Sequence, residues 1–408
     1  MWATATTRLA TTLFAATMLA GCWIQPGFGP TRQGYSPADG GTNAATVGQL
    51  EPAWRATTGA GANRPIVVGD RVVVTWRNNV RAFALHDGTP EWSRELSDEG
   101  APPDVIPYLG DPVSPYDGTI HVAGLIQRFG IAYVLDAETG EGEGQFGSGV
   151  PIGAPAVTPD ITVRASATVS SGGTLARLGY PGGPGLLYFG GPGLSTSITD
   201  PMVHRDRAWI GVGRNVLRFD FGVCVPAPPP VPVSLGCTAA KSIVAGTTVN
   251  TPAATDRDEI VVTDRGGGLQ VIDAGSAIVR WTADLGGELT APAIAPGRIL
   301  VGSGRGEVVA LRSGGCGSAT CEPLWRGATG SRVTTQPAVA GGVVYVGTAD
   351  GEVLAFATKG CGARTCAPLW VADATAGAPS GVRSGPILAA GRVIVVLESG
   401  DVVTFARP

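Results

Sequence analysis

The 408-residue chain is poor in charge and in histidine. Charged residues make up 15% of it and the net charge is −4, so no basic field is available to hold nucleic acid. The 3 histidines, His86, His121 and His204, fall at different places in the repeat described below, which argues against a shared metal or catalytic site. No G-x-S-x-G nucleophile motif and no adjacent pair of cysteines occurs. We therefore expect no catalytic residue, no bound metal and no nucleic-acid partner.

Long apolar runs are also scarce, and the main one lies at the N-terminus. Arg8 precedes the run Leu9–Ala20, which is too short to span a bilayer as a mature helix and is typical of a signal peptide. The run leads into L-A-G-C, ending at Cys22, and this pattern resembles the bacterial lipobox, in which the cysteine is lipidated and the preceding segment is removed. An ordinary signal peptide is the alternative.

The lipobox resemblance implies a division of the chain and a location. Residues 1–21 would be the signal peptide, Cys22 the lipid attachment site and residues 22–46 a tether. Each buried methylene contributes about 0.8 kcal/mol, so two or three acyl chains would hold the protein on a membrane. We expect an exported protein anchored to a bacterial membrane, on the periplasmic side of the outer membrane or the outer face of the plasma membrane, that contacts lipid only through this anchor.

Glycine and proline are abundant, by contrast, and they punctuate a repeat. The 62 glycines and 32 prolines separate short Val, Ile and Leu runs, which is typical of strands joined by tight turns. The clearest copies run from Pro292 to Trp325 and from Pro337 to Trp370, and each divides into four apolar runs, as a four-stranded meander would. Weaker copies raise the count to eight and begin at the remaining marker prolines: Pro65, Pro112, Pro155, Pro201, Pro252 and Pro386.

A four-stranded meander has two apolar faces that only neighbouring units can cover, and this favours a closed ring. The last unit stops at Pro408 before a fourth strand, whereas Leu50–Trp54 precedes the first unit and looks like the missing one. The sequence thus predicts an all-β fold over residues 47–408: an eight-bladed β-propeller of four-stranded antiparallel blades, closed by an N-terminal strand that completes the last blade. A linear solenoid is the alternative, and it explains no missing strand.

Six of the 7 cysteines remain once Cys22 is set aside, and all lie between the third and fourth runs of their units. An even number of cysteines in an exported chain predicts disulfides, and the close spacings suggest three local ones. These would staple long turns on one face of the ring, with zinc binding as the alternative. The predicted pairs are Cys224 with Cys237, Cys316 with Cys321, and Cys361 with Cys366.

Tryptophan recurs on the fourth run of several units, where a flat ring can dock between neighbouring blades. Stacking on a ligand is the alternative role for these residues. They are Trp54, Trp92, Trp281, Trp325 and Trp370. Together with turns such as D-A-E-T-G at 136–140 and the core V-V-Y-V-G-T-A-D-G-E-V-L-A-F at 343–356, they resemble the tryptophan-docking repeat of pyrroloquinoline-quinone-like (PQQ-like) propellers.

The resemblance points to two branches of this repeat family: the quinoprotein dehydrogenases, and lipid-anchored propellers of the BamB type that have no cofactor. A quinone cofactor with three carboxylates needs cationic donors, a platform for its ring and usually a calcium ion held by oxygen ligands. Quinoprotein dehydrogenases build part of that platform from two adjacent cysteines, which this sequence lacks. We therefore expect a monomeric scaffold without enzymatic activity or cofactor that binds envelope proteins through a propeller face, with a BamB-like role in outer-membrane protein assembly. A PQQ-dependent quinoprotein dehydrogenase with calcium is the alternative.

Overall fold

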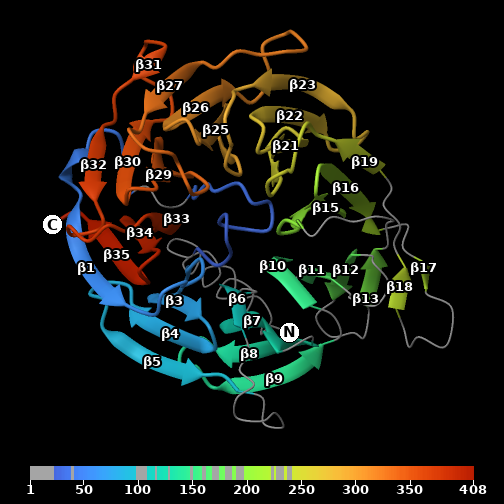
Figure 1. Ribbon diagram of the computed structural model, residues 1–408, viewed down its shortest axis with the longest axis vertical. Coiled ribbons are helices and arrows are strands. Elements are labelled where there is room, and N and C mark those ends of the chain that lie inside the picture. Colours follow the sequence, from blue (N-terminus) through green and yellow to red (C-terminus); the bar gives the residue numbers. More distant parts are fainter. Residues whose placement is uncertain are drawn as a thin grey trace, which may run out of the picture.

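The described part of the chain is almost entirely β-strand. A computed structural model describes residues 23–37, 41–97, 108–114, 117–126, 129–147, 150–158, 162–167, 174–179, 186–189, 197–221, 225–226, 234–236 and 241–408. Within these ranges the single helix is the short 3-10 turn η1 (Val47–Gln49). The strands build antiparallel sheets that follow one another around a common centre, so the molecule is a ring and not a linear stack (Figure 1). The predicted all-β propeller of antiparallel sheets is confirmed.

The described strands form eight sheets, numbered 1 to 8 here from β2 to β33. Sheets 1 to 4 contain β2 (Ile66–Val68), β3 (Arg71–Trp76), β4 (Asn79–Ala84) and β5 (Pro90–Glu95); β6 (Tyr108–Val113), β7 (Thr119–Ile126), β8 (Phe129–Asp136) and β9 (Gly142–Gly147); β10 (Val150–Val157), β11 (Thr162–Ala167), β12 (Thr174–Gly179) and β13 (Leu186–Phe189); and β14 (Met202–His204), β15 (Arg207–Val212), β16 (Asn215–Asp220) and β19 (Lys241–Val244).

Sheets 5 to 8 follow the same plan. They contain β20 (Ala253–Ala254), β21 (Glu259–Thr263), β22 (Gly268–Asp273) and β23 (Val279–Asp284); β24 (Ala293–Ala295), β25 (Arg298–Ser303), β26 (Glu307–Arg312) and β27 (Trp325–Ala328); β28 (Ala338–Ala340), β29 (Val343–Gly347), β30 (Glu352–Ala357) and β32 (Trp370–Asp373); and β33 (Val382–Ala389), β34 (Arg392–Leu397), β35 (Asp401–Ala406) and β1 (Glu51–Thr57). In each sheet the first strand is innermost and the last is outermost (Figure 1).

Local sequence explains why the strands fold back so tightly. Between β28 and β29 the turn is Gly341-Gly342, and both residues have positive φ, as the favoured two-residue hairpin turn requires. The flanking residues are mostly Val and Ala, and β29 is buried along its whole length. Because each sheet lies between two others, both of its faces carry apolar side chains.

The core therefore lies between sheets and not within them. One apolar cluster joins Val73 and Val80 of sheet 1 to Ile120 and Tyr133 of sheet 2, and all four side chains are nearly inaccessible. Similar clusters join sheets 5 and 6 and sheets 6 and 7. The apolar faces that a lone meander would expose are thus covered by its neighbours.

The two ends of the ring-forming chain meet in sheet 8. β1 pairs antiparallel with β35, and Pro52 faces Phe405 while Trp54 faces Thr404. An ion pair between Arg55 and Asp401, 2.9 Å apart, spans the same two strands. Sheet 8 therefore takes three strands from the C-terminal end of the chain and one from residues 51–57.

The five tryptophans lie where one sheet meets the next. The indole N–H of Trp54 donates to the Leu85 carbonyl at 2.9 Å, and that of Trp325 donates to the Thr358 carbonyl at 3.2 Å. Trp92 and Trp370 make equivalent bonds to Ala137 and Leu50, and Trp281 packs against Gly315. Each ring lies against a turn of the following sheet, which ties neighbouring sheets together.

The cysteine-bearing connectors join neighbouring sheets in a second way. Cys316–Cys321 and Cys361–Cys366 are disulfide-bonded, so these two pairs do not bind zinc. Within the second loop, β31 (Thr365–Cys366) pairs parallel with β27, the outermost strand of the preceding sheet. The first loop likewise pairs with β23 through Thr282 and Thr320. We call such a connector an edge clasp, because it covers the outer edge of the sheet before it.

A third connector has the same arrangement. Between the third and fourth strands of sheet 4 lie β17 (Val225–Pro226) and β18 (Ser234–Gly236), and β18 pairs parallel with β13 of sheet 3. Cys224 and Cys237, predicted to close this connector, lie outside the described residues, as does Cys22. The third disulfide and the lipid attachment site therefore stay predictions.

Substituting Gly360 should separate tryptophan docking from backbone strain. Gly360 has a φ of +79°, and a Cβ there would lie 2.5 Å from the Trp325 ring. We expect Gly360→Ala to lower the free energy of unfolding by about 3 kcal/mol, from a left-handed Ala plus overpacking. Gly362→Ala is the matched control, because its φ is +83° and nothing lies within 4 Å, and it should cost only about 1 kcal/mol. Equal losses in urea unfolding would contradict the docking role.

Removing one disulfide should loosen one edge clasp. Replacing Cys361 and Cys366 by serine should lower the free energy of unfolding by about 2 kcal/mol, since a short closed loop is released. The Arg326 amide donates to the Arg364 carbonyl across this clasp at 2.8 Å, so its hydrogen exchange should accelerate. The Thr282 amide, bonded to Ala319 in the other clasp, is the internal control. Unchanged exchange at Arg326 would show that the disulfide does not hold the clasp.

Candidate functional site

The chain itself lines the centre of the ring. Residues 23–36 run inside it, and their path is visible as the blue segment at the centre of Figure 1. Main-chain groups of the segment bond to the innermost strands or their ends in sheets 1, 2, 4, 5, 6 and 7, and the Gln25 side chain bonds to sheet 3. The successive pairs are Trp23–Val67, Ile24–Ser114, Gln25–Val157, Pro30–Val203, Thr31–Ala254, Gln33–Ile294 and Gly34–Val339.

The prediction of a tether over residues 22–46 is wrong for this segment. Trp23, Ile24 and Gln25 are at most 3% exposed, and the segment exchanges hydrogen bonds with strands from most of the ring. A free tether would leave its main-chain groups in water, whereas here they saturate the inner edges of the sheets. We call residues 23–36 the inner segment.

Arg32 anchors the inner segment through its side chain. The guanidinium is 1% exposed and donates to four carbonyl oxygens, those of Pro26, Ala154, Pro155 and Pro201. Burial lowers the pKa of Arg32 to about 10, and the charge of Asp200 opposes that shift. Arg32 is thus a buried cation at neutral pH that gathers sheets 3 and 4 around the segment.

A buried charge cluster surrounds Arg32. Arg64, Asp111 and Asp200 each come directly before the marker proline of their unit. Arg64 and Asp200 therefore lie just before β2 and β14, and Asp111 lies within β6. One nitrogen of Arg64 lies 2.5 Å from carboxylate oxygens of both Asp111 and Asp200. The other oxygen of Asp200 accepts the Ala154 amide at 2.8 Å. The cluster therefore links sheets 1, 2, 3 and 4.

The charges in this cluster stabilise one another. Burial alone would raise the pKa of the Asp200 carboxyl, but attraction by Arg64 and Arg32 holds it below its usual value. Burial likewise disfavours the charged form of Arg64, and the two carboxylates overcome this and raise its pKa. The Asp200 side chain is 6% exposed and the Arg64 side chain is 37% exposed, since Arg64 also borders a space of about 200 Å³ near the centre of the ring.

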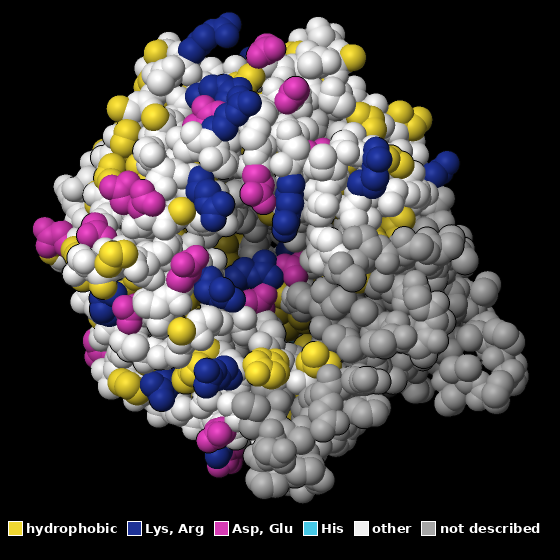
Figure 2. All heavy atoms as spheres, viewed as in Figure 1, with side chains coloured by type: hydrophobic (Ala, Val, Ile, Leu, Met, Phe, Trp, Pro, Cys, Tyr) yellow, Lys and Arg dark blue, Asp and Glu magenta, His cyan; other side chains and the backbone are white. Residues whose placement is uncertain are grey.

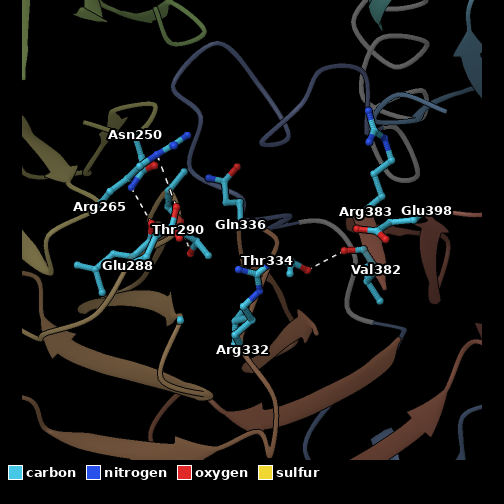
Figure 3. A pocket seen from close by; sticks show the side chains of 14 residues that line it. Asn250, Arg265, Glu288, Thr290, Arg332, Thr334, Gln336, Val382, Arg383 and Glu398 are labelled. Atoms are coloured by element: carbon cyan, nitrogen blue, oxygen red, sulfur yellow. Dashed lines mark hydrogen bonds and ion pairs between the residues drawn. The ribbon is translucent and has the colours of Figure 1, made fainter. Parts of the chain in front are cut away.

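A cavity of about 410 Å³ opens at the centre of the face opposite the cysteine connectors. Figure 2 shows the hollow, with cationic and anionic side chains around it. Its lining comes from sheets 5 to 8, and Figure 3 shows Arg332 and Gln336 near its middle and Arg265, Glu288, Arg383 and Glu398 at its sides. A deeper space of about 200 Å³ extends inward to Trp23, Pro26 and Gly27. The inner segment thus forms part of the floor.

The cavity is polar and holds more cations than anions. Arg265 pairs with Glu288 at 3.6 Å, and Arg383 donates to the Ala62 carbonyl at 2.9 Å. Within the described residues, neither Arg332 nor Arg383 has an ion-pair partner. The amide nitrogen of Gln336 already donates hydrogen bonds to the carbonyl oxygens of Arg32 and Pro292. Such a surface can bind carboxylates and peptide groups.

The cavity does not fit a quinone cofactor with calcium. Its arginines could hold carboxylates, but the described residues contain no group of three or more His, Cys, Asp or Glu that could bind a metal ion. The chain has no adjacent cysteines to form a platform, and the inner segment occupies part of the central space.

The remaining sequence candidates are scattered. His204 lies 2.8 Å from Asp258, His86 is exposed, and neither borders the cavity. The residues that do line it were missed, although a signal existed: the position before each marker proline faces the centre, as Arg64 and Gln336 show. Aligning the repeats on that position would have collected Arg64, Ala291 and Gln336, but not the arginines of the wider cavity or the inner segment, which has no repeat to reveal it.

Asp200 should confer a pH-dependent stability. Because its pKa is depressed in the folded protein, its contribution is present above the unfolded value of about 3.9 and is lost as pH falls through the folded pKa. Asp200→Asn should lower the free energy of unfolding by about 3 kcal/mol at neutral pH, since Arg32 and Arg64 lose a buried partner. The difference in free energy of unfolding between this variant and the unsubstituted protein should become smaller below about pH 4. Asp401→Asn, at a surface ion pair, should cost less than about 1 kcal/mol. A difference that is constant from pH 3 to 7 would refute the assignment.

Comparisons with known proteins agree with this architecture. Residues 295–407 match the family model described as outer membrane protein assembly factor BamB. A comparison with curated protein sequences finds no match. Among solved structures, BamB from Moraxella catarrhalis aligns with a TM-score of 0.57 at 14% identity, covering 86% of this chain and 100% of that one.

Two further structures show the same fold. The quinohemoprotein alcohol dehydrogenase ADHIIG from Pseudomonas putida HK5 aligns with a TM-score of 0.66 at 14% identity, over 98% of this chain and 82% of that one. The computationally designed Ika8 protein aligns with a TM-score of 0.67 at 14% identity, over 87% and 99%. At such identities the likeness concerns the fold alone. The chain thus shares the β-propeller fold of these structures, and its residues 295–407 are similar to the BamB family.

Proposed function

We propose that this protein is a membrane-anchored envelope lipoprotein that works as a binding scaffold without catalysis and takes part, like BamB, in outer-membrane protein assembly. In this proposal the eight sheets are the eight blades of a closed ring, with β1 completing the last one. The protein acts as a monomer, binds envelope proteins through the face that carries the cavity, and needs no cofactor.

The match to the BamB family model carries the proposal. It covers residues 295–407, which contain β25 to β35, and these strands and their turns supply much of the cavity lining. Arg332, Arg383 and Glu398 all belong to the matched region. The cavity is polar, open on one face and lined by turns, as expected of a surface that binds polypeptide and not of a dry catalytic pocket.

The anchor is proposed at Cys22. No helix in the described part of the chain is long and apolar enough to cross a membrane. The main chain is fixed from Trp23 onward by two hydrogen bonds to Val67, so a lipid on the neighbouring cysteine would hold the ring close to the bilayer without a spacer. Close attachment suits a scaffold that acts on other membrane-bound proteins.

Photo-crosslinking in bacterial cells tests the proposal. A photoreactive amino acid in place of Arg332 should capture envelope proteins of the outer-membrane assembly machinery, identified by mass spectrometry. The same amino acid in place of Ser93, which is exposed on the outer strand β5, is the control and should capture few. Cys22→Ser should move the protein from the membrane fraction to the soluble fraction, because the acyl chains would be absent.

Two results would overturn the proposal. Saturable uptake of pyrroloquinoline quinone with calcium, accompanied by alcohol or sugar oxidation, would make the protein an enzyme. If position 332 captures the same proteins as position 93, the cavity face is not a specific binding surface. If Cys22→Ser stays in the membrane fraction, the anchor alone is wrong.

A further inference from the structure

The outer edges of the sheets differ in whether another segment of the chain pairs with them. The outermost strands β13, β23 and β27 each pair with a parallel segment from the next sheet's connector. In the described chain the outer strand of sheet 7, β32, has no such partner and ends its sheet. An unpaired edge presents a row of free N–H and C=O groups that another chain can pair with.

The open edge of β32 has a topological cause. A clasp comes from the connector between the third and fourth strands of the following sheet. In sheet 8 those strands are β35, which ends at Ala406, and β1, which begins at Glu51, so no connector joins them. In the described chain, the sheet that takes strands from residues 51–57 and 382–406 therefore supplies no clasp.

β32 is less protected than other free edges. Natural edge strands carry charged residues or proline that discourage pairing with other chains. Among the other unclasped outer strands, β5 carries Pro90 and Arg94, β1 carries Pro52 and Arg55, and β19 begins with Lys241. Around β32 two exposed side chains are apolar, Leu369 at 41% and Val371 at 46%, and the charged Asp373 stands only at the end of the strand.

The clasped neighbour shows what β32 is missing. Arg326 follows Trp325 in sheet 6 just as Val371 follows Trp370 in sheet 7, and each faces the third strand at the same register. The Arg326 amide donates outward to the clasp at Arg364, and the equivalent Thr282 amide donates outward to Ala319. The Val371 amide is in the same position, and no described segment pairs with it, although Leu50 contacts the neighbouring Trp370.

A charge is also left without its counterpart. In sheet 6 the Arg326 guanidinium forms an ion pair with Glu307. Glu352 occupies the position of Glu307 in sheet 7, but Val371 stands in place of the arginine. In the described chain Glu352 has no ion pair. An occupant of this edge would gain by supplying a basic side chain near Glu352.

We propose that the outer edge of β32 is a docking site for an extended segment of a partner polypeptide, which adds as a parallel strand, covers Leu369 and Val371 and places a basic residue near Glu352. The parallel direction follows the three clasps. Main-chain pairing would supply affinity and the alternate side chains specificity, as in other cases of strand addition. This inference deepens the proposed function and rests on the protein being a polypeptide-binding scaffold.

The probe is a short fluorescein-labelled peptide in which threonine and valine alternate with arginine, titrated by fluorescence anisotropy against the soluble Cys22→Ser protein. The same peptide with its central residues changed to proline is the control, since it keeps the charge but cannot form a strand. Val371→Arg restores the residue that sheet 6 tolerates at this position and should weaken binding at least about tenfold, through lost apolar contact and an internal partner for Glu352. Val244→Arg, on the exposed outer strand β19, should leave binding unchanged.

Saturable binding that the proline peptide and Val371→Arg both lose, and that Val244→Arg keeps, supports the site. No saturable binding to the unsubstituted protein, or equal binding by Val371→Arg, overturns it. The unfolding midpoint of each variant, expected to match that of the parent, excludes a folding defect. If Val371→Arg fails to affect the peptide while crosslinks from Arg332 persist in cells, this inference alone is wrong and the proposed function stands.

Discussion

The hydrogen-bonding groups at the edges of the sheets are the constraint on which this structure depends. Packing eight small sheets side by side covers their apolar faces but leaves inner and outer strands with unpaired N–H and C=O groups. On the inside, the main chain of the inner segment forms hydrogen bonds with these groups in one strand after another around the centre. On the outside, the edge clasps pair with such groups in three of the sheets.

The same constraint explains why disulfides accompany the clasps. A connector that reaches the neighbouring sheet must be longer than a tight turn, and its extra residues lose conformational entropy when they are ordered. Closing Cys316–Cys321 and Cys361–Cys366 removes part of that cost from the folding reaction. Short connectors, such as the one after Asp136, are fixed by side-chain bonds to their own main chain and need no disulfide.

The sequence predicted the parts of the fold that repeat. Prolines, tryptophans and cysteine pairs recur at fixed positions in the unit, so the antiparallel sheets, the two described disulfides and the location of the tryptophans between sheets were accessible. The position of the inner segment could not be predicted from the sequence, because the segment occurs once, lacks periodicity and is bound by main-chain groups of distant residues. Arg32, for example, bonds to Pro201, which is 169 positions away, and no local pattern signals such a contact. The charge cluster lay between these cases, since Arg64, Asp111 and Asp200 share a repeat position but not a residue type.

The repeated sheets, and the one sheet that takes strands from both ends of the described chain, together indicate where this molecule can bind others. In this ring the first and last described strands meet in one sheet, and that sheet has no connector between its third and fourth strands. It therefore supplies no clasp to the outer edge of the sheet before it, and β32 is unclasped, as β1, β5 and β19 are. The described chain thus leaves the outer edge of β32 unpaired, and Val371 stands there in place of an arginine. An edge that is open for topological reasons would ordinarily be guarded against aggregation. β32 keeps one charge, that of Asp373, while Leu369 and Val371 stay exposed, and this combination of an unpaired main-chain edge and exposed apolar side chains marks it as a surface for a partner.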